Sequence, residues 1–246
     1  MKIDLKSIGK HLYAAIFKDT DTKLLTLIIL TDFAFILLHF VHFRFGFLAD
    51  VKWSLSEERG YSEIFQYIQL AWITITLGLY FIKTSTAIYS IWSFLFFYLL
   101  LDDSLQIHEN VGWYVANIFD FKDAFNLRSY DFGEIIVYIT SGVSFLFAII
   151  FSYQKSGPKA RAISNNILFL LVTFVFFGFG IDMLGNIIYK MFRITNDASF
   201  ASIFIEIVED GGEMLVIGIT TWYVLTINPC LDQNDFGSGR KIGRHA

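Results

Sequence analysis

Cysteine, proline and charge are scarce in this chain, whereas long apolar runs are abundant. The single cysteine, Cys230, cannot form a disulfide within the chain. With only 2 prolines, few helices can be interrupted by this residue. Charged residues make up 17% of the chain, against about 25% in a typical soluble domain. The mean hydropathy of +0.54 agrees with this. The composition argues against a soluble globular domain and favours a multi-pass membrane protein.

Six apolar segments of about 20 residues are long enough to cross a bilayer as helices. They cover residues 24–43, 61–82, 87–109, 132–153, 167–189 and 200–226. Pro158 and Pro229 both fall in the connections, so no proline kink is expected within a span. We therefore predict an all-α integral membrane protein, built as a bundle of six transmembrane helices.

The ends of the chain flank one transmembrane domain, residues 24–227. In residues 1–23, apolar side chains repeat at helical spacing among lysines, as in an amphipathic helix at the membrane interface. Residues 228–246 form a polar tail. With a cytoplasmic N-terminus, 12 of the 19 Lys and Arg residues lie inside and 7 outside. The positive-inside rule thus predicts two cytoplasmic termini, and we expect a bacterial inner membrane.

Under this topology, 17 of the 23 acidic residues lie on the outer side. Several belong to the spans themselves and reach the same depth, because neighbouring helices run in opposite directions. The candidate metal ligands are Asp102, Asp103, His108, Glu109, Asp182, Glu206, Glu209, Asp210 and Glu213. Possible additional ligands are Glu63, Glu134, Asn186, Gln106, His39 and His42.

The spacing of these residues places them on one face of each helix. Asp102, Gln106 and Glu109, for example, follow one another at i, i+4 and i+7. Carboxylates that are ionised together in a medium of low dielectric repel one another. Protons, basic partners or a bound cation could neutralise them. Because lysine is absent at this depth and Arg44 is the only arginine close to an outer helix end, a divalent cation is favoured. Oxygen ligands suit Mg²⁺, Ca²⁺ or Mn²⁺, and imidazole shifts the preference toward iron, manganese or zinc.

Simpler interpretations of the same residues stay open. Acids at the start of a helix are stabilised by the helix dipole without any ligand. Asp182 could be protonated and hydrogen-bonded to Asn186. For His39 and His42, packing and hydrogen bonding at the membrane interface are favoured over metal ligation.

The Asp102-Asp103 pair before His108-Glu109, together with Glu209-Asp210 and Glu213-Met214, resembles a pattern in uncharacterised bacterial multi-pass membrane proteins. The resemblance covers about half of the chain and implies no activity. Ferritin-like di-iron proteins usually supply two Glu-x-x-His pairs, but Leu105 stands three residues before His108. A di-iron site of that kind is therefore not expected. The sequence also contains no phosphate-binding loop and no nucleic-acid footprint.

We therefore predict a metal-dependent integral-membrane enzyme whose site opens toward the extracytoplasmic side and whose substrate is lipid-like. A divalent-cation transporter or channel is one alternative. It would need a polar route to the other side, but residues 88–101 and 167–181 carry no charge, and only Asp32 interrupts the inner half elsewhere. A structural or pH-sensing membrane subunit is the other alternative.

Overall fold

The computed structural model describes residues 22–46, 48, 50–123, 128–181, 184–185 and 200–229, and this part of the chain is helical without any strand. The helices are α2 (Thr22–Phe45), α3 (Tyr61–Thr84), α4 (Ala87–Leu105), α5 (Ile107–Ile118), α6 (Ser129–Lys155), α7 (Pro158–Val175) and α9 (Phe200–Thr226). A 3₁₀ turn (Val51–Trp53) and a π-helical segment (Phe176–Ile181) complete the described elements. The all-α class is therefore confirmed for these residues.

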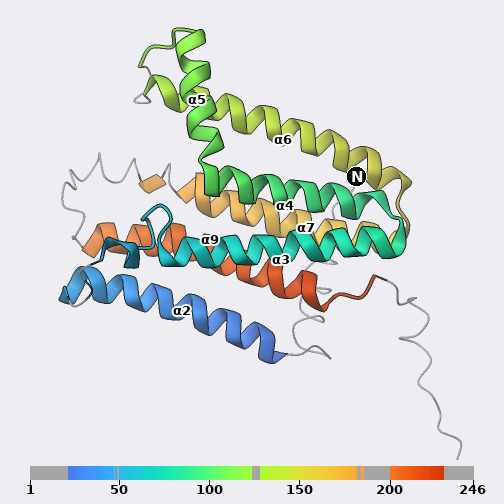
Figure 1. The fold of residues 1–246 in the computed structure, drawn as a ribbon, viewed down its shortest axis with the longest axis horizontal. Helices are drawn as coiled ribbons and strands as arrows, with labels where there is room; N and C mark the ends of the chain where they lie inside the picture. The colour runs from blue at the N-terminus through green and yellow to red at the C-terminus, as the bar shows by residue number, and fades with distance from the viewer. Residues whose placement is uncertain are drawn as a thin grey trace, which may run out of the picture.

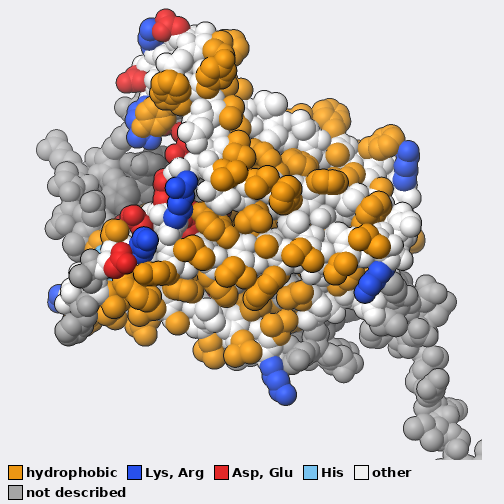
Figure 2. All heavy atoms as spheres, viewed as in Figure 1, with side chains coloured by type: hydrophobic (Ala, Val, Ile, Leu, Met, Phe, Trp, Pro, Cys, Tyr) orange, Lys and Arg blue, Asp and Glu red, His pale blue; other side chains and the backbone are white. Residues whose placement is uncertain are grey.

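Five helices are long and apolar enough to cross a membrane: Thr22–Phe45, Tyr61–Thr84, Ala87–Leu105, Ser129–Lys155 and Pro158–Gly178. Large apolar side chains cover the sides of the bundle (Figure 2). Such a surface suits lipid better than water. The chain thus has the build of a multi-pass membrane protein. The sixth predicted span corresponds to α9, which has 27 residues but carries four acids in its first half.

Helix α9 occupies the centre of the bundle, in contact with α2, α3 and α7 (Figure 1). Small residues allow this close packing. A Cβ atom at Gly211 would lie 3.3 Å from the side chain of Ile36 on α2, and one at Gly212 would overlap the ring of Phe177. The helix α9, which carries four acids in its first half, is therefore enclosed by its neighbours.

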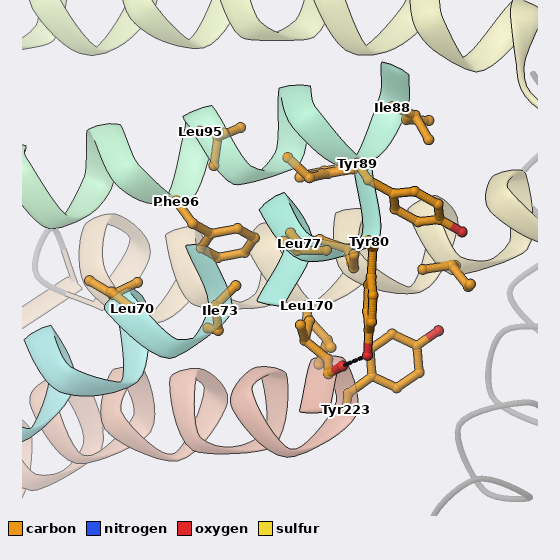
Figure 3. Close-up of a cluster of buried hydrophobic side chains, with 14 of the residues drawn as sticks. Leu70, Ile73, Leu77, Tyr80, Ile88, Tyr89, Leu95, Phe96, Leu170 and Tyr223 are labelled. Atoms are coloured by element: carbon orange, nitrogen blue, oxygen red, sulfur yellow. Dashed lines mark hydrogen bonds between the residues drawn. The ribbon is translucent and has the colours of Figure 1, made fainter. Parts of the chain in front are cut away.

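Aromatic side chains fill one end of the bundle, here called the tyrosine end and defined by Tyr80, Tyr89 and Tyr223 (Figure 3). The hydroxyl of Tyr80 donates to the backbone oxygens of Val224 and Ile227, at 2.8 and 2.6 Å. The amide of Asn166 donates to the hydroxyl of Tyr223 at 2.8 Å. These bonds satisfy buried polar groups and join α3, α7 and α9.

At the opposite end, here called the carboxylate end, α3, α6 and α9 begin and α4 finishes (Figure 1). The hairpin of α5 and α6 projects beyond the bundle here. Acidic side chains gather below this hairpin together with basic ones (Figure 2). The depth predicted for the acids of alternate helices therefore corresponds to one end of the observed bundle.

The predicted third span, residues 87–109, is wrong at its end. The helix stops at Leu105 because Gln106 adopts a left-handed conformation (φ 52°) and its N–H closes the last turn on the carbonyl of Asp102. Such a residue ends an α-helix. The chain resumes as α5, so Asp102, Gln106 and Glu109 do not form one stripe.

The start of α7 also differs from the prediction. Pro158 occupies the first turn of α7 rather than a connection, a position where its missing N–H costs nothing. The amphipathic helix predicted within residues 1–23 falls almost wholly outside the described residues, as does most of the predicted tail, 228–246.

Candidate functional site

The break at Gln106 brings His108 against Asp102. The backbone N–H of His108 donates to Oδ1 of Asp102 at 2.9 Å, and its ring Nδ1 lies 3.1 Å from Oδ2. Asp102 therefore caps the start of α5, where the helix dipole favours a negative charge. Only 3% of Asp102 is exposed. On an unbroken helix His108 would have pointed away from this carboxylate, so the left-handed turn creates the pair.

The surroundings of His108 favour its protonated form. Burial disfavours the charge, but the hydrogen bond that the imidazole donates to Asp102 and the charges of Asp102, Glu109 and Glu134 outweigh it and raise the pKa above 6.5. Nε2 lies 3.8 Å from Oε1 of Glu109. The ring stacks on Tyr138, with 4.9 Å between the ring centres. Helices α4, α5 and α6 thus fix the imidazole from three sides.

Three carboxyl groups from three different helices interact electrostatically beside this pair. They are Glu63 of α3, Asp103 of α4 and Glu213 of α9, here called the outer carboxylate cluster. The charge of Asp103 interacts with that of Glu63, and the charge of Glu213 interacts with both. Among the described residues, no lysine or arginine forms an ion pair with any of the three.

Local packing holds the members of the cluster in place. A Cβ atom at Gly178 would overlap Oε1 of Glu213, so the π-helical segment lies directly against this carboxylate. Glu63 accepts a hydrogen bond from the backbone N–H of Arg59. The hydroxyl of Tyr67 donates to the backbone oxygen of Asp103 at 3.4 Å. Close packing against Gly178 thus restricts the position of the Glu213 carboxyl group on α9.

The other acids of α9 are half-buried near the cluster. Glu209 and Asp210 both interact electrostatically with Glu213. Glu206 lies instead beside α2, where its Oε2 is 3.6 Å from Nε2 of His39 and accepts a hydrogen bond from Ser56 at 3.0 Å. The sixth predicted span thus contributes to two separate polar regions.

The predicted histidines of α2 are directed to the loop that follows it. His39 is fully buried, and its Nδ1 accepts the backbone N–H of Leu55 at 3.0 Å. Nδ1 of His42 lies 2.6 Å from the backbone oxygen of Leu48. Both rings therefore fasten the connection between α2 and α3, as expected from the simpler interpretation of these residues.

A pocket of about 300 Å³ opens between α5 and α6 and is lined by Glu109, Asn110, Trp113, Tyr130 and Glu134. Glu134 and Glu109 both interact with the charge of His108. Two predicted site residues therefore line this pocket beside the His108 pair. Gln106 instead faces the loop before α3, where it contacts Glu58 and Arg59.

The predicted ligands do not stand as one preformed site. In the part of the chain that the structure describes, no three His, Cys, Asp or Glu side chains are arranged to hold a metal ion. Asp182 and Asn186 lie outside the described residues. Sequence reasoning missed Tyr67 and Tyr138, although each follows a predicted acid by four residues and therefore shares its helix face.

The chain was also compared with known proteins. Neither the curated proteins nor the solved structures gave a match. One family model, described as a domain of unknown function (DUF8692), matches residues 24–228 and so includes every described helix from Leu24 onward. The predicted resemblance to a family without an assigned activity is confirmed at this level. By this match over most of its length, the chain belongs to the DUF8692 family.

Proposed function

We propose that this protein is a metal-dependent integral-membrane enzyme whose outer carboxylate cluster binds a divalent cation. The observation that carries the proposal is the electrostatic interaction of Glu63, Asp103 and Glu213, which come from α3, α4 and α9. Ionised carboxylates repel one another in a medium of low dielectric. A cation of charge +2 would offset the repulsion. Oxygen ligands suit magnesium, calcium or manganese, and His108 beside them would extend the choice to iron or zinc.

The proposal requires the cluster to contract when the cation binds, because no three described ligands stand in metal geometry. Without a bound cation, carboxylates that repel one another move apart, so cation binding would draw them together. The cation would supply Lewis-acid chemistry. The chain itself offers His108, held by Asp102 and Tyr138, as a candidate general acid or base.

A lipid-like substrate suits the position of the site. The pocket beside His108 is lined by Trp113 and Tyr130 as well as by two carboxylates, and aromatic side chains of this kind favour the boundary between lipid and water. The substrate would enter from the membrane with its polar group toward Glu109 and Glu134.

The topology completes the proposal. With α9 as the sixth span, both termini lie in the cytoplasm and the carboxylate end faces outward. The excess of Lys and Arg on the inner side supports this orientation. We place the protein in a bacterial inner membrane because its acidic pattern resembles that of uncharacterised bacterial multi-pass membrane proteins.

Metal analysis of detergent-purified protein tests the cation. We expect about one to two divalent ions per chain in the wild type and a loss of most of them in Glu213→Ala and Asp103→Ala. Glu57→Ala, in the loop before α3, is the matched control and should retain the metal. Equal metal content in all four proteins, or none in the wild type, would overturn the proposal.

A second experiment tests the enzyme. Purified protein is incubated with liposomes of a bacterial lipid extract, with or without a chelator, and the lipids are examined by mass spectrometry. Conversion that requires both the metal and His108 supports an enzyme. Metal binding with cation flux into empty liposomes, and without conversion, would instead identify a transporter. If neither metal nor flux is found, the structural subunit is the remaining explanation.

A further inference from the structure

Asp32 is a buried acid at the middle of α2, on a different helix from the members of the outer carboxylate cluster. At 1.5 Å per residue it lies about 15 Å from one end of α2 and about 20 Å from the other. Its exposed fraction is 0%. Neither carboxyl oxygen has a hydrogen-bond partner. Within the described residues, no ion pair includes Asp32.

The side chain beside Asp32 is an amide that also lacks hydrogen-bond partners. Gln69 of α3 lies against the Asp32 carboxyl and is also 0% exposed. Both its Oε1 and its Nε2 lack a partner. The Gln69 amide is thus within reach of the Asp32 carboxyl, but in the observed rotamers the two groups do not meet the geometry of an ordinary hydrogen bond. Each offers what the other needs, since an amide both donates and accepts.

Helix α9 encloses this pair from the third side. A Cβ atom at Gly218 would lie 2.7 Å from Oδ2 of Asp32 and 2.8 Å from the side chain of Ile28. Only glycine leaves room for the carboxyl group here. Because Gly218 carries no side chain and Gln69 is neutral, the groups shown facing Asp32 from α9 and α3 supply no charge to balance a carboxylate.

The side chains of Asp32 and Gln69 suit a proton better than a metal ion. An unpaired carboxylate at the middle of a bilayer is unfavourable by several kcal/mol. A metal ion would need about six oxygen ligands, and Asp32 and Gln69 supply three side-chain oxygens between them. A proton needs only one acceptor. It converts Asp32 into a neutral acid that can donate to Oε1 of Gln69 while Nε2 donates back to the second carboxyl oxygen.

We propose that Asp32 and Gln69 form a proton-binding site in the interior of the membrane, in which a neutral carboxylic acid is paired with an amide. A rotation of the Gln69 amide completes both hydrogen bonds. The site is separate from the outer carboxylate cluster, whose members are Glu63, Asp103 and Glu213, and does not depend on a metal there.

Infrared spectroscopy of the purified full-length protein at neutral pH tests this site. The wild type should show a protonated carboxyl stretch that shifts in D₂O and is absent in Asp32→Asn. In Gln69→Leu the same band should move to higher frequency because the acid has lost its amide partner. Glu213→Gln is the control and should leave the Asp32 band in place.

Two results would overturn the inference. One is an Asp32→Asn spectrum that matches the wild type in the carboxylic acid region. The other is a wild-type band that appears only after sodium is removed, which would assign the site to a cation. Should Asp32→Asn fail to fold, Gln69→Leu decides: a shifted band supports the pair, and an unshifted or missing band excludes it.

Discussion

The tyrosine end and the carboxylate end of the bundle bury polar groups in different ways. At the tyrosine end, donors meet acceptors: Tyr80 bonds to backbone oxygens, Asn166 to Tyr223, and Trp92 to Ser164 at 2.8 Å. At the carboxylate end, the charges of Glu63, Asp103 and Glu213 repel one another, and Glu63 is only partly compensated by the backbone N–H of Arg59. In the first arrangement these donors and acceptors satisfy one another and stabilise the fold, although Nε1 of the neighbouring Trp222 has no partner among the described residues. The second gains from a cation, so we expect function at that end.

The largest effect should follow from a cavity at the tyrosine end. Trp92→Ala removes a fully buried indole and its hydrogen bond to Ser164, and we expect a loss of about 3–5 kcal/mol of unfolding free energy. Unfolding by detergent titration in mixed micelles measures it. Trp113→Ala is the control, since 63% of Trp113 is exposed. Equal losses in the two variants would show that this end is not the stabilising core.

A smaller effect should follow from overpacking the carboxylate end. In Gly178→Ala the added methyl group overlaps Oε1 of Glu213, the far end of a flexible side chain, and we expect a loss at the low end of about 1–3 kcal/mol together with weaker cation binding. Gly142→Ala is the matched control, because a Cβ atom there meets no neighbour. Isothermal titration with Mn²⁺ and thermal unfolding measure the two effects. Unchanged values in Gly178→Ala would mean that this segment does not position the carboxylate.

Two conservative substitutions, one at each end of the bundle, should affect the unfolding free energy differently. Tyr80→Phe removes the hydroxyl that bonds to Val224 and Ile227 and should destabilise the protein by about 1 kcal/mol. In the presence of a chelator, Glu213→Gln should instead preserve or raise the stability, because an amide of the same size replaces a carboxyl group that lies near other carboxyl groups. Thermal unfolding in chelator compares them. A destabilised Glu213→Gln would indicate that the acids already have adequate partners.

The smallest expected effect is the pH dependence of the stability that His108 contributes. The pKa of His108 is raised above its ordinary 6.5 by Asp102 and its neighbours, so the folded state holds the proton more tightly. The stabilisation is complete below pH 6.5 and is lost as the pH rises through the folded-state pKa. Unfolding curves of wild type and His108→Gln in chelator should therefore converge over that range. Parallel curves would contradict the assigned interaction.

Hydrophobic length accounts for most of the fold that the sequence predicts. Residues 61–82, for instance, fall within α3 as observed, because a span of this length must satisfy its backbone internally in lipid. The end of α4 could not be predicted. No glycine, proline or other helix-ending residue stands in Leu105-Gln106-Ile107. The break depends on the left-handed conformation of Gln106, which lets Asp102 cap the next helix.

The candidate site was predictable in part. Counting depth along antiparallel spans places Glu63, Asp103 and Glu213 at one level, and in the structure their charges interact, although these side chains do not form a metal-binding group. The same reasoning could not separate Glu206 from them, because the choice between α2 and α4 as a neighbour depends on how α9 is oriented. It also could not assign His39 to the loop, since the partner N–H belongs to Leu55, sixteen residues later.

By itself, the sequence determined that the chain forms long apolar helices, because lipid leaves a spanning backbone few other ways to satisfy its hydrogen bonds. It also determined that acids collect at one end, because charge is distributed unevenly along alternating spans. Only the tertiary structure decided which carboxylates interact with one another and which form hydrogen bonds with loop residues. The reason is that side-chain encounters depend on helix rotation and close approach, set here by Gly178, Gly212 and Gly218, and hydropathy carries no information about either.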